Sequence, residues 1–111
     1  MITEQPILIT SIKTYVDLSK NRIISFNATY SASLAPLGVC NADTKANGYA
    51  PITTHGIALV EAGSDIFKGD KVGSDSQGRA VPEPFFTNYL GRALDGALSA
   101  GNLIRVILNI N

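Results

Sequence analysis

Turn-forming glycines divide residues 56–81 into segments that are too short for helices. Glycine suits each chain reversal because it adopts positive φ at little steric cost. Strands this short bury little surface singly, so they have to close on one another. The stretch therefore predicts an all-β fold, a small barrel or sandwich. The expected strands are Ile57–Val60, Lys71–Gly73 and Arg79–Val81, with turns at Ala62-Gly63, Gly69-Asp70 and Gln77-Gly78.

Alternating apolar residues predict two longer strands, one on each side of this stretch. In residues 22–30 one face carries Ile24, Phe26, Ala28 and Tyr30. In Asn102–Asn111 an apolar face carries Ile104, Val106, Leu108 and Ile110, and Arg105 belongs to the mixed face opposite. This two-residue period is that of a half-buried strand, and no window keeps a helical period. We therefore expect Val106→Asp to be far more damaging than Arg105→Asp.

Shorter strands complete the expected sheet. They are Leu37–Cys40, Tyr49–Thr54 and Leu90–Leu94. Proline cannot donate to a β-ladder, so Pro51 restricts the second of these to an edge or a bulge.

A spacing of glycines recurs along the chain and suggests internal repetition. Leu37-Gly38 precedes Gly48 by the same interval that separates Leu90-Gly91 from Gly101. A stretched third copy would run from Gly56-Ile57-Ala58 to Gly69. Repeated hairpin-like units indicate a pseudo-symmetric small barrel.

The first 14 residues form a separate apolar segment, the N-terminal arm. It carries Ile7, Leu8, Ile9 and Ile12, and no turn signal couples it to the next strand. Burying such side chains gains roughly 1.5–3 kcal/mol each, so we expect the arm to pack on the body or on a neighbour. We therefore expect an arm over residues 1–14, one β-barrel domain over 15–111, and contacts to another subunit through the arm residues and Arg105.

Composition excludes several classes of partner. Nine lysines and arginines balance nine acidic residues, so no basic field attracts nucleic acid or an anionic membrane. No run approaches the length of a membrane span, and the single Cys40 cannot form an internal disulfide. The first residues lack a basic region followed by an apolar core, so we expect no signal peptide. We expect a soluble chain made in a cytosol. Its 45% hydrophobic and 16% charged content leaves open an apolar contact surface or a well-filled barrel.

Catalytic and cofactor-binding parts are missing from the sequence. His55 is the only histidine, so a catalytic triad or a histidine metal site has no second partner. The carboxylates Glu61, Asp65, Asp70 and Asp75 lack the spacing of a calcium loop. Cys40 lies in an apolar strand without a paired base, and Phe85-Phe86 with Tyr89 suit a core plug or a binding face. We expect a protein that is not an enzyme, with no metal and no cofactor.

The order of the glycine motifs resembles the small capsid cement, or head decoration, proteins of tailed bacteriophages. The likeness covers residues 15–108 and begins with Asp17-Leu18-Ser19 before a β-run. It departs from the family pattern at Gly101-Asn102, where Gly-Asp is usual. The motifs are Leu37-Gly38-Val39, Gly56–Ala62, Ile66–Val72 with Asp75 and Gly78, Leu90–Leu94, and Gly101 followed by Ile104–Leu108.

The resemblance implies a structural virion protein on the outer surface of the phage head, assembled in the host cytoplasm. Its partner would be the major capsid protein, whose neighbouring subunits it would bridge against internal DNA pressure. Self-association would be as a homotrimer, with a dimer as the alternative. The arm is not part of the family pattern, so the expected contacts to the capsid or to another subunit, Ile7, Leu8, Ile9, Ile12 and Arg105, rest on the physical argument above. A carbohydrate- or peptide-binding β-module of a phage tail or adhesin remains the competing interpretation, with Tyr49 and Tyr89 as its exposed aromatic residues.

Overall fold

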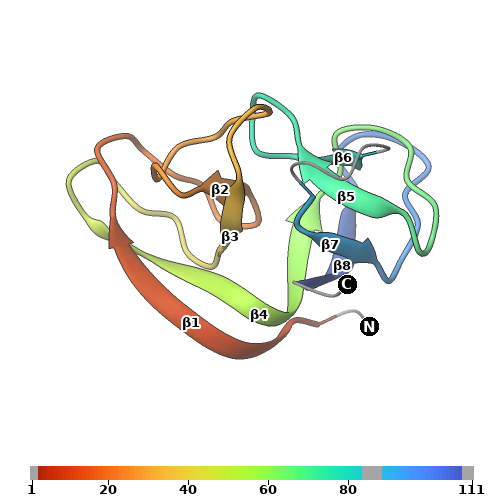
Figure 1. Ribbon diagram of the computed structural model, residues 1–111, viewed down its shortest axis with the longest axis horizontal. Coiled ribbons are helices and arrows are strands. Elements are labelled where there is room, and N and C mark those ends of the chain that lie inside the picture. Colours follow the sequence, from red (N-terminus) through yellow and green to blue (C-terminus); the bar gives the residue numbers. More distant parts are fainter. Residues whose placement is uncertain (1–2, 84–88, 109–111) are drawn as a thin grey trace.

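The computed structural model describes residues 3–83 and 89–108, and this part of the chain is all β, as predicted (Figure 1). One antiparallel sheet of eight strands curls into a nearly closed barrel, with the strand order β2-β3-β4-β8-β7-β5-β6 and with β1 paired to β4. The strands are β1 (Gln5–Lys13), β2 (Ile23–Ser25), β3 (Pro36–Cys40), β4 (Tyr49–Glu61), β5 (Lys71–Ser74), β6 (Ala80–Pro82), β7 (Gly91–Ala93) and β8 (Leu103–Leu108).

Strand β4 is one continuous strand where the sequence predicted two, Tyr49–Thr54 and Ile57–Val60. It runs for 13 residues and is sharply bent in Figure 1. We attribute the bend to Gly56, whose φ of 103° departs from that of an ordinary strand. Its first half lies between β1 and β3, and its second half pairs with β8. Pro51 is therefore inside the sheet and not at an edge. The proline is tolerated because its carbonyl faces Asn41, where β3 has just ended, so no ladder donor is needed there.

Strand β2 is much shorter than the alternation over residues 22–30 predicted. It ends at Ser25 because a tight turn follows, in which Ala28 N–H donates to the Ser25 carbonyl (3.0 Å) and Ser25 N–H donates to the Thr29 carbonyl (2.9 Å). Ala28 has a φ of 61°, and the side chain of Phe26 is 67% exposed. The Ser25 hydroxyl, 3.3 Å from Asn27 N, favours the turn over a continued strand.

The core consists of two apolar clusters, and strands with alternating buried residues contribute side chains to both. Strand β8 follows its predicted pattern, with Ile104, Val106 and Leu108 buried; Ile110 lies outside the described residues, as do Phe85 and Phe86. The larger apolar cluster fills the barrel around β8. A smaller one under β1–β3 contains Leu18, Ile24, Cys40, Ala50 and Ile52, and Ile12 packs against it.

Two halves of the chain repeat one hydrogen-bonding pattern. We call them the first repeat (residues 5–55) and the second repeat (residues 53–108); they overlap in β4. The glycine echo between Gly38 and Gly91 marks this repetition, because the two glycines face corresponding residues of the neighbouring strands. The matching pairs are Ile24–Gly38 with Val72–Gly91, Cys40–Ile52 with Ala93–Val106, and Thr10–Ile52 with Ala58–Val106.

The suggested third copy is not a structural unit. Gly56 does not occupy the place of Gly38 or Gly91; it bends β4, the strand in which the two repeats overlap. The barrel is thus pseudo-symmetric with two units, and β1 of the first repeat corresponds to the second half of β4.

Candidate interaction surface

The N-terminal arm is a strand whose apolar side chains face solvent. Strand β1 pairs with β4 from Gln5 to Lys13, with register shifts on both sides of Leu8. Ile7, Leu8 and Ile9 are 82%, 51% and 44% exposed, whereas Ile12 packs on the smaller core cluster. Within the described residues β1 pairs with no strand other than β4, so its second edge offers unpaired backbone groups. Exposed apolar side chains beside an open strand edge are typical of a contact surface.

A shallow groove runs beside this strand. It has a volume of about 540 Å³ and combines Leu8 and Thr10 of β1 with the exposed Phe26 and with Thr54 and His55 of β4. His55, the only histidine of the sequence, forms a hydrogen bond with its chain neighbour, with its Nδ1 atom 3.0 Å from Thr54 Oγ1. The groove therefore extends the apolar surface of β1 and holds no catalytic pair.

Arg105 lies in the second repeat, on β8, and is bound within the chain. Its Nε and Nη2 atoms donate to the Asp95 carboxylate at 2.8 and 2.9 Å, and its backbone N–H donates to the same group at 3.0 Å. These bonds lower the pKa of Asp95 to about 2 and raise the pKa of Arg105. The guanidinium group of Arg105 is thus fixed in orientation, with the side chain 32% exposed.

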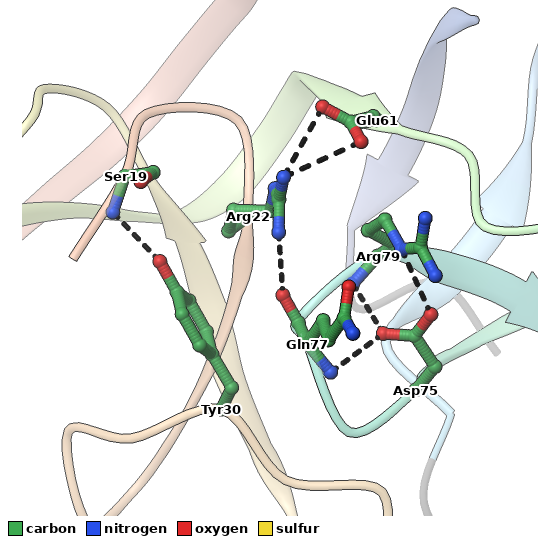
Figure 2. A network of polar contacts seen from close by, with 7 residues as sticks. All are labelled: Ser19, Arg22, Tyr30, Glu61, Asp75, Gln77 and Arg79. Atoms are coloured by element: carbon green, nitrogen blue, oxygen red, sulfur yellow. Dashed lines mark hydrogen bonds and ion pairs between the residues drawn. The ribbon is translucent and has the colours of Figure 1, made fainter. Parts of the chain in front are cut away.

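A polar network ties the two repeats together (Figure 2). Arg22 of the first repeat donates through Nη1 to the Gln77 carbonyl (2.8 Å) and lies 3.3 Å from the Glu61 carboxylate. Beside it, Asp75 accepts from the backbone N–H groups of Gln77 and Arg79, both at 2.8 Å. Backbone bonds add to this contact, since Ile23 N–H donates to the Gly78 carbonyl (2.7 Å). The network therefore links the first repeat to the second repeat.

The four carboxylates considered for calcium do not converge. Glu61 and Asp75 belong to the network just described, Asp70 accepts from Phe67 N–H (2.9 Å), and Asp65 is exposed. Within the described residues no three acidic, histidine or cysteine side chains are grouped to hold a metal ion. Cys40 is buried, burial raises the pKa of its thiol, and its Sγ donates to the Ala42 carbonyl (3.1 Å). The described part of the chain also contains no helix able to cross a membrane.

Each repeat carries a pair of neighbouring loops, which we call its loop tip, and the two tips correspond in position. The sequence analysis did not identify either tip as a candidate site. In the first repeat residues 17–19 and 43–45 enclose a depression of about 270 Å³. In the second repeat residues 65–68 and 96–98 enclose one of about 320 Å³, which includes Phe67 and Leu98. These two side chains are 73% and 89% exposed. The sequence contained one signal for the second tip: Phe67 and Leu98 are large apolar residues in loops, outside any alternating strand pattern.

Comparison with known proteins agrees with this architecture. No curated protein matches the chain. Among solved structures, the crystal structure of the head fiber gp8.5 N base of bacteriophage phi29 aligns with a TM-score of 0.70 at 20% identity, over 92% of this chain and 93% of that one. At this identity the likeness shows a shared fold. The family model of the phage cement proteins matches residues 2–108, which confirms the resemblance of the glycine motifs. The chain belongs to the phage cement protein family.

Proposed function

We propose that this chain is a non-enzymatic virion protein that binds the outer surface of the phage head. There it contacts the major capsid protein, bridges neighbouring subunits and stabilises the shell. Family membership supports a capsid-associated structural role. The observation that carries the finer proposal is β1, a nine-residue strand with an open edge and outward apolar side chains.

The energetics of β1 favour a partner. Ile7, Leu8 and Ile9 remain in water while their strand is already ordered on β4. Covering Ile7 would gain roughly 1.5–3 kcal/mol, and covering the half-exposed Leu8 and Ile9 would gain about half as much each. The strand is already ordered, so binding does not have to supply its ordering entropy. An extended segment of a capsid subunit can add to the free edge of β1, with its side chains covering Ile7 and Ile9.

The same strand is the proposed contact between copies of the chain. A homotrimer is the expected assembly and a dimer the alternative, with Ile12 and Arg105 as further contact residues. Arg105 suits this role because its bonds to Asp95 hold the exposed part of the guanidinium group in place. Assembly onto heads in the host cytoplasm completes the proposal.

The test uses heads from the phage that encodes this chain, prepared without the protein. Wild-type protein is expected to bind them to saturation at micromolar concentration and to delay their thermal disruption. The double variant Ile7→Ser, Ile9→Ser keeps the backbone pairing of β1 and should bind at least tenfold more weakly. Leu103→Ser is the matched control, because Leu103 is exposed to the same 44% as Ile9 and also lies on a strand.

Light scattering on the same proteins gives the oligomeric state. Absence of wild-type binding to undecorated heads would refute the capsid role. Equal loss of binding in the β1 variant and in the Leu103 control would refute the assignment of the contact to β1.

A further inference from the structure

The loop tips of the two repeats share one backbone arrangement. In the first repeat Leu18 and Thr44 exchange two backbone hydrogen bonds, both of 2.8 Å. In the second repeat Ile66 and Ala97 exchange the corresponding pair, at 2.9 and 2.8 Å. Three residues after the first member, a residue with positive φ continues the match: Asn21 N–H donates to Cys40 O (2.9 Å), and Gly69 N–H donates to Ala93 O (2.7 Å).

Side chains beside these bonds differ in kind between the two tips. In the first repeat the residues that follow Leu18 and Thr44 are Ser19 and Lys45. In the second repeat the residues that follow Ile66 and Ala97 are Phe67 and Leu98. The first repeat builds its tip with a serine and a lysine, so the backbone arrangement does not need large apolar groups there. Phe67 and Leu98 are almost fully in solvent, at 73% and 89% exposure, and contribute little to the core.

We propose that Phe67 and Leu98 form a second docking point for the capsid surface, separate from β1. The lining of their depression, which has a volume of about 320 Å³, combines these two apolar side chains with Asp65 and Lys68, one charge of each sign. This is the anatomy of a small protein contact. The complementary partner surface is an exposed aliphatic or aromatic side chain of a capsid subunit, seated between Phe67 and Leu98.

The size of the patch favours the capsid over a second copy of this chain. A stable dimer buries about 800 Å² on each partner, whereas one large aromatic side chain supplies about 150–250 Å². Two side chains are therefore too few to hold free copies together. On a shell, the tip would act together with β1 of the same molecule, and the second contact forms at high effective concentration.

The position of the tip suits a bridge. In Figure 1 the loops after β4 and after β7, which carry Phe67 and Leu98, reach the right-hand end of the molecule, whereas β1 runs along the lower left. Two separated contacts on one rigid chain can engage two capsid subunits. This inference rests on the proposed function and adds the second of the two contacts that bridging requires.

The test exchanges the tip residues for those of the first repeat, in the double variant Phe67→Ser, Leu98→Lys. Because Ser19 and Lys45 occupy the same backbone places, the variant should fold with a melting temperature within a few degrees of wild type. We expect at least tenfold weaker binding to undecorated heads. The control is Ser19→Ala, Lys45→Ala at the other tip, which should bind as wild type does. If the double variant unfolds, Leu98→Lys alone replaces it.

Three other results would separate the possibilities. Wild-type binding with unchanged binding of the tip variant would overturn this inference and leave the proposed function standing. A tip variant that loses self-association in light scattering but keeps its head affinity would make the tip a contact between copies, which also overturns it. No binding by the wild type would remove the proposed function itself.

Discussion

Replacing Gly91 with alanine should destabilise the protein by about 3–5 kcal/mol, because β7 and β8 approach too closely for a side chain at this position. A Cβ atom at Gly91 would overlap the carbonyl oxygen of Ile107, and it would lie 2.8 Å from the carbonyl carbon of Ile107 and 3.0 Å from the Cα atom of Leu108. All of these are backbone atoms of a paired strand, so no side-chain rotation can relieve the overlap.

The magnitude follows from the ladder that has to open. Strand β7 pairs with β8 through Gly91, Arg92 and Ala93, and Leu94 N–H donates to the Arg105 carbonyl (2.8 Å) just beyond them. Moving β7 away by about 1 Å stretches hydrogen bonds of about 2.9 Å beyond their useful range. Each lost bond costs about 0.5–1.5 kcal/mol, and misfit in a packed core adds about 1–3 kcal/mol. The sum is a large share of the roughly 5–15 kcal/mol that stabilises an ordinary domain.

Urea unfolding of the purified variants measures this cost. Gly69→Ala is the matched control, because nothing lies within 4 Å of its Cβ position and only its φ of 86° is unfavourable. Its expected cost is about 1–2 kcal/mol. Gly38→Ala should resemble Gly91→Ala, since its Cβ would overlap the Thr53 carbonyl oxygen in the first repeat. A Gly91 variant as stable as the Gly69 variant would show that the close approach of β7 and β8 is wrong.

Four further substitutions probe single features. Ala28→Gly should stabilise by about 0.5–1 kcal/mol, because alanine at a φ of 61° is strained; a loss of stability in urea would contradict this. Val106→Asp should cost several kcal/mol because Val106 is fully buried in the core, whereas Arg105→Asp should cost much less, through the loss of the partly exposed pair with Asp95. Equal melting temperatures of the two variants would refute the inward orientation of Val106 on β8. Asp95→Asn should lower the free energy of unfolding by about 0.5–1 kcal/mol at pH 7, because solvent screens this partly exposed pair. Arg105 lowers the pKa of Asp95 from 3.8 to about 2, so this difference should be present above pH 3.8 and vanish as the pH falls through 2; a constant difference in acid unfolding curves would contradict it.

Alternation of apolar residues predicted β8 well and β2 badly, for a physical reason. In β8 the alternation of Ile104, Val106 and Leu108 with Arg105 and Ile107 runs through a strand that pairs with β4 along its whole length. After Ile24 the same alternation is broken by Ser25 and Thr29, whose hydroxyls lie 3.1 Å apart across a tight turn. Short-range side-chain bonds of this kind compete with strand pairing and do not show in a hydrophobic pattern.

The glycine spacing found two of the real repeat positions because the constraint there is steric. Gly38 and Gly91 both face a carbonyl oxygen of the next strand, so glycine is required in each copy. Gly56 is required for a different reason, because its positive φ allows the bend in β4. The spacing from Gly56 to Gly69 therefore does not mark a third structural repeat. A glycine count cannot distinguish these causes.

The exposed apolar strand was visible in the sequence, whereas the second tip was not. Ile7, Leu8 and Ile9 stand close together in a segment without turn signals, so their excess is apparent. Phe67 and Leu98 are far apart in the chain and each is the only large apolar group exposed in its loop. Their importance emerges when the backbone bonds pair them with Ser19 and Lys45, and no local pattern encodes that comparison.

A bridging protein must also carry force between its two contacts, and the repeat architecture suits that task. The proposed contact on β1 belongs to the first repeat and the proposed tip belongs to the second. Strand β4 runs without interruption from one repeat to the other. Its first half bonds to β1 along the strand, and its second half bonds to β8, which follows the loop of Leu98. A pull between the contacts would load these ladders in shear, where several hydrogen bonds share the strain. The bonds of Arg22 (Figure 2) and the backbone bond from Ile23 N–H to the Gly78 carbonyl add links between the repeats beside β4. Weakening them by Arg22→Ala should therefore leave binding to heads unchanged and reduce the protection of heads against heat. If Arg22→Ala protected heads as well as the wild type does, force transfer between the repeats would not depend on this network.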